Sequence, residues 1–173
     1  ALPISFVIDA GCFKAASDVF NNYTENLFNK NLYDDIFDMF PDKSILTPHT
    51  GELNYLDSTL CQKSFKDMQK RIKDKIVIVK SFNTFIITKD MIYIMDRGPS
   101  ILATAGTGDV LSGILVSLLS QGYSRLEASI LGTYLHAEAA NYYMNNISKD
   151  GMTASDLIDC IPHAFNILRN NEE

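Results

Sequence analysis

The run from Lys75 to Lys80, Lys-Ile-Val-Ile-Val-Lys, limits the possible folds of this chain more than any other segment. Its four interior residues are all β-branched and apolar, whereas a strand with one face in water alternates apolar and polar residues. Such a run is typical of a strand that is buried on both faces. We therefore expect a central strand of a sheet at these residues.

The segments around this strand alternate between strand-like and helix-like patterns, which predicts an α/β fold with a mostly parallel sheet. Further strands are expected at residues 4–9 and 43–46, and a β-hairpin at 84–88 and 91–95. Helices are expected at residues 12–22, 26–39, 53–56, 60–73, 107–121 and 125–145. A last helix follows a capping box of Thr153 and Asp156, and Pro162 is expected to restart or kink it.

Length and charge limit the class of protein. The chain has 173 residues and a mass of 19.3 kDa, the size of one ordinary domain. With 46% hydrophobic and 21% charged residues, it is expected to be a soluble globular domain rather than a disordered or coiled-coil protein. Its formal net charge is −6 and no basic run is longer than Lys70-Arg71, so no nucleic-acid partner is expected.

The cysteines and the apolar runs exclude further classes. Cys12, Cys61 and Cys160 are an odd number without a C-x-x-C pair, which indicates neither a disulfide framework nor a zinc site and favours a cytoplasmic protein. We interpret all three as small buried apolar residues. The longest mostly apolar stretch, residues 110–119, is too short to cross a bilayer, so no membrane insertion is expected.

The strongest signal for chemistry is the segment Leu102-Ala-Thr-Ala-Gly-Thr-Gly-Asp109, at the start of the helix expected at 107–121. Its small residues and glycines allow backbone N–H groups to turn toward an anion at a helix N-terminus. A carboxylate there suits kinase-type chemistry, because Asp109 could accept the proton of a hydroxyl that attacks phosphorus. The alternative is an Asp that only caps the helix. The segment lacks the Gly-Lys-Ser/Thr of a Walker A motif.

Three motifs occur along the chain: Thr47-Pro-His-Thr-Gly-Glu52, Ala103-Thr-Ala-Gly-Thr-Gly-Asp-Val-Leu-Ser-Gly113 and Gly151-Met-Thr-Ala-Ser-Asp-Leu157. Together they resemble those of the ADP/ATP-dependent NAD(P)H-hydrate dehydratase family, in the family's order and approximate spacing. The resemblance implies an α/β fold of the ribokinase-like superfamily, a three-layer sandwich with a mostly parallel sheet. It also implies that residues 1–173 are the C-terminal part, about two-thirds, of a single domain that lacks its N-terminal portion. The strand at 4–9 then resembles an interior strand of the family sheet.

Each site residue is carried over from the resemblance by its place in a motif. His49 resembles the histidine that contacts the hydrated nicotinamide, and Asp109 the aspartate at the reacting hydroxyl, so Asp109 is both catalytic and substrate-binding. The nucleotide-binding residues are expected to be Ala105, Gly106, Thr107 and Gly108, with Lys80, Ser81, Phe82, Asn83 and Thr84.

The assignments of residues 80–84 and of Glu52 each leave an alternative open. Residues 80–84 are similar to a family Lys-Gly-x-x-Thr segment, but Ser81 replaces the glycine, which requires either a negative φ or a strained loop. Glu52 resembles the Glu of an Asn-x-x-Glu element and is expected to hold Mg²⁺ through water. Alternatively, Glu52 is an acid that the helix dipole favours at a helix start.

The activity that the resemblance implies is the repair of NADHX and NADPHX, the hydrated forms of NADH and NADPH. ADP or ATP, with Mg²⁺, phosphorylates the C6 hydroxyl, and elimination of phosphate restores NADH or NADPH, which makes the enzyme a lyase. A cytoplasmic homo-oligomer is implied, with an NAD(P)HX epimerase either fused or separate. The alternatives are a ribokinase-like kinase of a small vitamin-precursor alcohol and a nucleotide-binding subunit without catalysis.

Three further expectations concern the rest of the chain. His136 lies beside the apolar stripe of its helix and is interpreted as a packed, hydrogen-bonded histidine. Asp9 follows a strand at the edge where open α/β sheets bind ligands, so it either lines the cleft or caps a loop. The strand at 4–9 is expected to need cover from an upstream segment or a neighbouring subunit, because an open apolar edge pairs readily.

Overall fold

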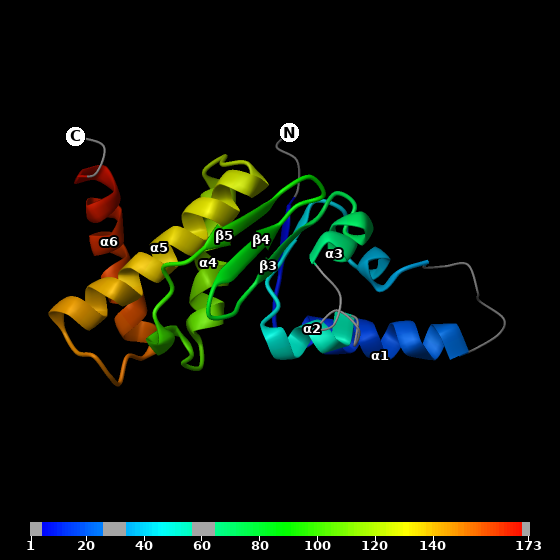
Figure 1. Cartoon of the computed structure of the whole chain (residues 1–173), viewed down its shortest axis with the longest axis horizontal. Coiled ribbons are helices and arrows are strands. Elements are labelled where there is room, and N and C mark those ends of the chain that lie inside the picture. The colour runs from blue at the N-terminus through cyan, green and yellow to red at the C-terminus, as the bar shows by residue number, and fades with distance from the viewer. Residues whose placement is uncertain (1–4, 26–33, 57–64, 171–173) are drawn as a thin grey trace. The chain divides into compact units, whose positions relative to one another are not determined.

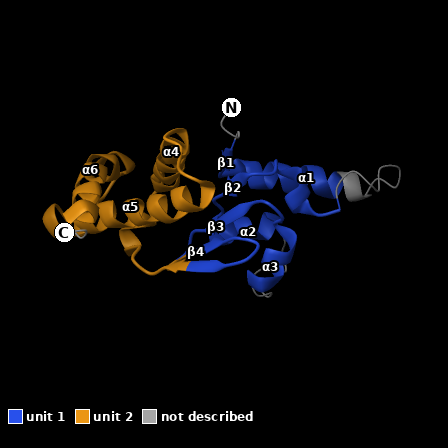
Figure 2. Ribbon diagram, turned by 90° about the horizontal axis from the view of Figure 1, so that it is seen from above, with its two compact units in different colours: residues 1–81, 85–93 blue, residues 82–84, 94–173 orange. Residues whose placement is uncertain are grey.

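The computed structural model describes residues 5–25, 34–56 and 65–170 of the chain. These residues form two compact units, coloured separately in Figure 2. Unit 1 comprises residues 1–81 and 85–93, and unit 2 comprises residues 82–84 and 94–173.

The sheet contains five strands in the order of the sequence (Figure 1). Its first three strands run parallel, and the fourth is antiparallel to the third. The third strand is buried at all four residues, which confirms the expectation of a central strand buried on both faces. The sheet is therefore mixed, with its parallel part at the N-terminal side. The strands are β1 (Phe6–Ile8), β2 (Ser44–Leu46), β3 (Ile76–Val79), β4 (Thr84–Ile87) and β5 (Ile92–Met95).

The hairpin at the end of the sheet closes through a threonine side chain rather than through a glycine. The hydroxyl of Thr88 accepts a hydrogen bond from the backbone N–H of Met91 at 2.9 Å and donates one to the Met91 carbonyl at 3.0 Å. The backbone N–H of Thr88 also donates to that carbonyl at 2.9 Å. These bonds hold the turn in place, which confirms the predicted hairpin although its sequence lacks the usual turn residue.

Three α-helices of unit 1 are α1 (Gly11–Glu25), α2 (Thr50–Leu56) and α3 (Phe65–Arg71). The helix predicted at 26–39 is wrong in its described part, because Ile36–Met39 forms a 3₁₀ helix. Asp35 precedes it, accepts a hydrogen bond from the N–H of Phe37 and also pairs with Arg71 at 2.6 Å. This long-range pair fixes the start of a separate short element. Residues 26–33 and 57–64, where parts of two predicted helices fall, lie outside the described residues.

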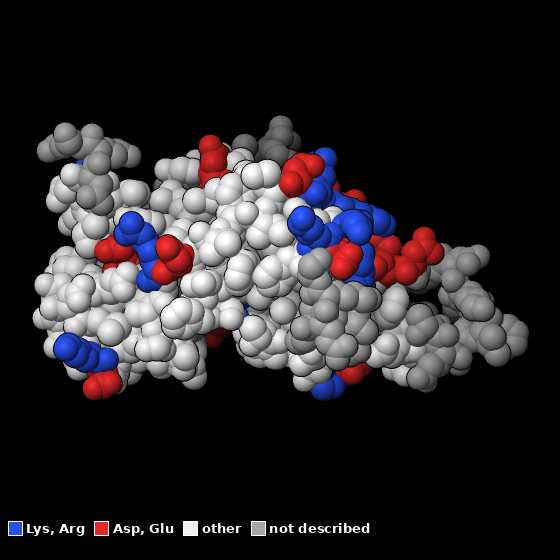
Figure 3. Space-filling model, in the orientation of Figure 1, with Lys and Arg blue, Asp and Glu red and all other residues white. Residues whose placement is uncertain are grey.

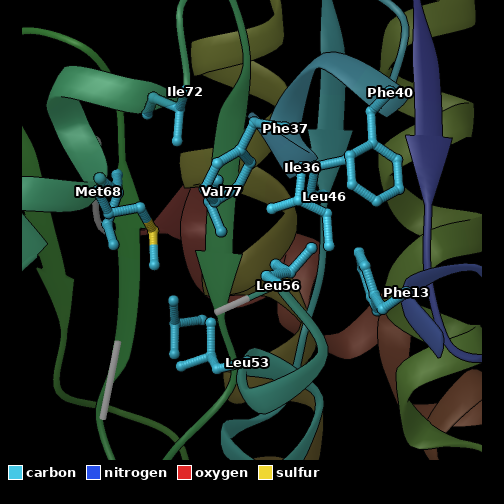
Figure 4. Close-up of a cluster of buried hydrophobic side chains, with 12 residues drawn as sticks. Phe13, Ile36, Phe37, Phe40, Leu46, Leu53, Leu56, Met68, Ile72 and Val77 are labelled. Atoms are coloured by element: carbon cyan, nitrogen blue, oxygen red, sulfur yellow. The ribbon is translucent and has the colours of Figure 1, made fainter. Parts of the chain in front are cut away.

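The core of unit 1 joins these helices to the sheet, as the converging side chains in Figure 4 show. Phe13 of α1 packs edge-on against Phe40 with 6.0 Å between ring centroids. Phe37, Leu46 and Met68 are completely buried in the same cluster. Burial of each such side chain stabilises the folded state by about 1.5–3 kcal/mol, so this cluster is the main hydrophobic contribution within unit 1.

Unit 2 is built from three long helices, α4 (Thr107–Ser120), α5 (Arg125–Asn146) and α6 (Ala154–Asn170). The predicted bounds of α4 and α5 are confirmed within one residue, and Gly122 follows α4 with a φ of 93°. The predicted capping box of α6 is present: Thr153 Oγ1 accepts from the N–H of Asp156, whose carboxylate accepts from the N–H of Thr153. The helix runs through Pro162 without restarting.

Charged side chains of both signs lie intermixed on the face seen in Figure 3. Lys75 illustrates the local pairing, since its side chain is 1% exposed and its ammonium lies 2.9 Å from the carboxylate of Asp42. Of the two described cysteines, Cys160 is buried as expected, but Cys12 is exposed, so the interpretation of Cys12 as a core residue is wrong. No helix among the described residues is both long and apolar enough to span a membrane.

We expect Phe37→Ala to lower the free energy of unfolding by about 3–5 kcal/mol, because it opens a cavity in a fully buried site. Denaturant unfolding followed by circular dichroism measures the change. Phe82→Ala is the matched control, since Phe82 is 84% exposed and its truncation should alter stability by less than about 0.5 kcal/mol. Equal losses in the two variants would contradict the assignment of the core.

Candidate functional site

The loop before α4 is shaped by a glycine in the left-handed region. Gly106 has a φ of 86° and caps the N-terminus of α4. A Cβ atom at this position would lie 3.0 Å from the Cβ of Ala154, the first residue of α6. Glycine is therefore favoured here for two reasons: it tolerates the positive φ, and it lets the two helix N-termini approach closely.

Backbone donors collect at this helix start. Within the described chain, no backbone carbonyl outside α4 accepts a hydrogen bond from the N–H groups of Ala105, Gly106, Gly108 or Asp109. The N–H of Val110, one residue further on, is the first to bond back to the loop, at 3.1 Å from the Gly106 carbonyl. Unpaired N–H groups at the positive end of a helix dipole form a site for phosphate or a developing oxyanion.

Thr107 holds this loop together from within. Its hydroxyl lies 2.7 Å from the carbonyl of Leu102 and 2.8 Å from that of Thr104, and its residue is 5% exposed. Its N–H also donates to the Thr104 carbonyl, at 3.3 Å. The predicted contact of Thr107 with a nucleotide stays a prediction, and the interactions of its side chain are those of a residue that shapes the loop.

Asp109 lies in the first turn of α4 and is exposed. In the part of the chain that the structure describes, its carboxylate forms neither a hydrogen bond nor an ion pair. It lines one end of a hollow of about 520 Å³ between α4 and α6. The walls of this hollow are largely apolar and include Val110, Ile114, Leu118, Ile158, Ile161 and Phe165. A carboxylate without partners beside free N–H groups is able to accept a proton next to a bound anion.

A second group of predicted residues lies in unit 1, at the carboxyl ends of the parallel strands. Lys80, after β3, places its ammonium 2.8 Å from the carboxylate of Asp9, which follows β1. The hydroxyl of Thr47, after β2, donates to the Ile8 carbonyl at 3.3 Å. The parallel register brings these three residues to one edge of the sheet, where open α/β sheets bind ligands.

The Asp9 carboxylate is ionised in this setting. Burial alone raises its pKa, but the hydrogen bond and charge of Lys80, with hydrogen bonds from Thr47 and the Ala10 backbone, outweigh burial and hold the pKa below its usual value. The sequence predicts Asp9 and Lys80 at strand ends but does not predict that they pair. The order and register of β1, β2 and β3, had they been known, would have predicted this pair.

Ser81 replaces a family glycine, so its backbone conformation decides whether the segment at 80–84 is strained. Non-glycine residues with positive φ in the described ranges are Ala10, Lys43 and Lys73, so Ser81 needs no left-handed backbone. Its replacement of glycine therefore introduces no strain of that kind. Phe82 is the most exposed large hydrophobic residue described, at 84%, and the nucleotide-binding role of the segment stays a prediction.

His49 and Glu52 form a reciprocal pair at the start of α2. The N–H of His49 donates to Glu52 Oε2 at 2.8 Å, and the N–H of Glu52 donates to His49 Nδ1 at 3.2 Å. Since Nδ1 accepts, the proton of the neutral ring is on Nε2, which lies 3.5 Å from Glu52 Oε1. A Cβ at Gly51 would be 2.9 Å from the Cε1 of His49, so glycine makes room for the imidazole. The His49 side chain is 57% exposed and open to a ligand.

The same contacts bear on the predicted metal role of Glu52. One carboxylate oxygen accepts the N–H of His49, and the other faces the imidazole. Among the described residues, no group of three or more His, Cys, Asp or Glu side chains is placed to hold a metal ion. These contacts suit an acid at a helix start, and the role of Glu52 in holding Mg²⁺ through water stays a prediction.

The fold defines the class of protein. A ribokinase-like superfamily protein from Enterococcus faecalis superimposes with a TM-score of 0.72 at 21% identity, covering 96% of this chain and 54% of that chain. The fold is thus ribokinase-like, as expected. A family model described as NAD(P)H-hydrate dehydratase matches residues 3–163. The chain belongs to the NAD(P)H-hydrate dehydratase family.

Two relatives show how much of a family member is present. The bifunctional NAD(P)H-hydrate repair enzyme Nnr of Moorella thermoacetica is 36% identical over 136 residues, which cover 75% of this chain and 25% of that protein. The ADP/ATP-dependent NAD(P)H-hydrate dehydratase of Bacillus subtilis, co-crystallized with ATP/Mg²⁺ and soaked with CoA, has a TM-score of 0.65 at 26% identity, covering 73% of this chain and 51% of that chain. The chain thus matches about half the length of the solved dehydratase.

We expect Gly106→Ala to destabilise the fold by about 1–2 kcal/mol, because alanine resists the positive φ and its Cβ meets Ala154. Gly113→Ala is the matched control within α4, where no atom lies within 4 Å of the added Cβ. Alanine there should raise the free energy of unfolding by about 0.5–1 kcal/mol through its higher helix propensity. Thermal unfolding of the two variants measures both changes, and a shared sign would refute the expected role of Gly106.

We expect Asp9→Asn to lower the free energy of unfolding at about pH 7 by about 1–3 kcal/mol, because it leaves the half-buried Lys80 without its counter-charge. The pKa of Asp9 is depressed in the folded state, so its stabilisation is complete above the unfolded value of about 3.9 and is lost as the pH falls through the folded value. Wild type and variant should therefore converge in denaturant titrations as the pH falls below the unfolded value and through the lowered folded value.

Asp90→Asn is the control for this titration. Asp90 is exposed, and its carboxylate forms no hydrogen bond or ion pair within the described ranges. The substitution should change stability by less than about 0.5 kcal/mol at any pH tested. A difference between wild type and Asp9→Asn that does not shrink in acid would show that the ion pair is not its source.

Proposed function

We propose that this chain carries the nucleotide-binding and catalytic part of an enzyme that dehydrates NADHX and NADPHX to NADH and NADPH. One observation carries the proposal: the Asp109 carboxylate, without partners among the described residues, lies beside free N–H groups at the start of α4. Membership of the dehydratase family supports the substrate class. We further propose that residues 1–173 are the C-terminal part of a single ribokinase-like domain.

In the proposed reaction, Asp109 accepts the proton of the C6 hydroxyl of the hydrated nicotinamide. The hydroxyl oxygen forms a bond to the terminal phosphorus of ADP or ATP, and the bond from that phosphorus to its bridging oxygen breaks, which releases AMP or ADP. The free N–H groups of Ala105, Gly106 and Gly108 stabilise the negative charge on the transferred group. The lone pair of the ring nitrogen then expels phosphate from C6, and loss of a proton from C5 restores the reduced nicotinamide.

The remaining roles follow from the placement of the residues. His49 presents an exposed Nε2–H that suits an oxygen acceptor on the nicotinamide. Residues 80–84 are proposed to line the nucleotide-binding site. Lys80 either contacts a phosphate directly or stays paired with Asp9 and shapes the site. Mg²⁺ would enter with the nucleotide and neutralise part of the phosphate charge, as the ATP/Mg²⁺ in the Bacillus subtilis crystals suggests by analogy.

We also propose four properties of the whole protein. ADP and ATP are both proposed as donors, in line with the ADP/ATP-dependent enzyme of Bacillus subtilis. An epimerase activity is proposed to act with it, either fused or separate, since the Moorella thermoacetica relative is named bifunctional. A cytoplasmic location and a homo-oligomer complete the proposal.

Asp109→Asn tests the proposed base. We expect kcat for recovery of the reduced-nicotinamide absorbance from NADHX and ADP·Mg²⁺ to fall by about 10²–10⁴-fold, because the amide cannot accept the hydroxyl proton. The calorimetric affinity for ADP should change little. Asp159→Asn, an exposed substitution on α6, is the control and should keep wild-type turnover.

The same assay separates the alternatives. A kinase of another small alcohol would bind nucleotide but restore no absorbance from NADHX. A non-catalytic subunit would bind ADP with no turnover of either substrate. A variant Asp109→Asn that keeps more than about a tenth of wild-type kcat would contradict the assignment of the base.

A further inference from the structure

A buried histidine reaches the first turn of α4 from the neighbouring helix. His136 lies in the middle of α5 and is 9% exposed. Its Nε2 is 2.8 Å from the backbone carbonyl oxygen of Thr107, 29 residues earlier in the chain. A carbonyl oxygen only accepts, so Nε2 carries a proton and donates it. The sequence-based interpretation of a packed, hydrogen-bonded histidine is therefore confirmed.

The acceptor is the residue that joins the anion-binding loop to α4. The side chain of Thr107 bonds to the carbonyls of Leu102 and Thr104, and its own carbonyl accepts from His136. Thr107 is therefore held on the loop side by its hydroxyl and on the α5 side by its carbonyl. The next two residues are Gly108, which supplies a free N–H, and Asp109, the proposed base. A movement of Thr107 displaces both.

The packing of α4 on α5 does not by itself fix that first turn. The two helices approach closely at Gly132, where a Cβ would lie 2.9 Å from Cδ2 of Leu115, in the middle of α4. His136 is one turn further along α5 and contacts the end of α4. Apolar contacts at Leu115 hold the helices together, whereas a directed hydrogen bond sets where the first residue of α4 lies.

We propose that His136 is a positioning residue that holds Thr107, and through it the free N–H groups and the carboxylate of Asp109, in the geometry needed for phosphoryl transfer. The catalytic consequence rests on the proposed function, but the positioning itself does not. His136 touches neither substrate nor nucleotide in this role. Its effect is carried by one hydrogen bond from α5 to the start of α4.

Hydrogen–deuterium exchange of the whole chain tests the positioning without any ligand. His136→Leu removes the donor while keeping an apolar side chain, and exchange in a peptide covering residues 102–110 should rise by about fivefold to tenfold, the equivalent of one hydrogen bond. A peptide covering residues 112–120 should be unchanged. His136→Gln restores a donor at the end of its side chain and should recover most of the protection.

Thr133→Val is the matched control on the same helix. Thr133 is buried one turn before His136, and its hydroxyl donates only within α5, to the carbonyls of Ser129 and Ile130. This variant should leave the exchange of residues 102–110 at the wild-type level. A uniform rise over α4, α5 and α6 in His136→Leu, or the same local rise in Thr133→Val, would overturn the proposal.

Turnover and binding then test the catalytic consequence. His136→Leu should lower kcat by about tenfold to a hundredfold, since small displacements of a base have effects of that order, while His136→Gln recovers most of it. The KM for NADHX should change less than kcat, because His49, the other residue proposed to contact the nicotinamide, lies in unit 1 and not on α4. If wild type shows no turnover, the proposed function fails, and the exchange experiment still decides the positioning role. Loss of local protection with unchanged kcat would refute the catalytic consequence alone.

Discussion

The left-handed backbone at Gly106 is the constraint on which the candidate site depends. Because no side chain is present there, the N-termini of α4 and α6 come within van der Waals contact. Among the described residues, the turn leaves the N–H groups of Gly108 and Asp109 without backbone carbonyl partners, and Asp109 lines an apolar hollow. A β-branched or even a small side chain at position 106 would separate the helices. The arrangement of these N–H groups, which suits an anion, is therefore set by backbone shape before side-chain chemistry.

At the carboxyl ends of the parallel strands, charge is balanced by a side-chain ion pair rather than by backbone N–H groups. Lys80 and Asp9 neutralise each other at 2.8 Å, with side chains that are 23% and 13% exposed. A half-buried ammonium that already has a carboxylate partner offers a phosphate less net positive charge than an unpaired one. In the proposed site, the phosphate charge must then be met mainly by backbone N–H groups and by the cation that accompanies the nucleotide. Preorganisation of those N–H groups, to which His136 contributes, becomes correspondingly more important.

The sequence predicted the regular elements well because their signals are local. The β-branched run at Ile76–Val79, the cap at Thr153 and the glycine after α4 each act within a few residues. The 3₁₀ helix at Ile36–Met39 was mistaken for part of a longer helix because a distant residue, Arg71, pairs with its cap. The pairing of Asp9 with Lys80 and the bond from His136 to Thr107 span 71 and 29 residues, and periodicity carries no information about them.

Glu52 shows how a motif can carry two meanings. The spacing of His49 and Glu52 resembles that of a metal-binding Asn-x-x-Glu element. It is also the spacing at which an N-cap residue and an acid at N3 exchange hydrogen bonds. Here His49 occupies the cap position, and its ring and backbone both bond to Glu52. The carboxylate therefore fixes the imidazole, with Gly51 leaving space beneath the ring. A histidine whose Nδ1 is held by the helix start can present only its Nε2–H to a ligand, so this local capping geometry determines which proton the predicted substrate contact would use.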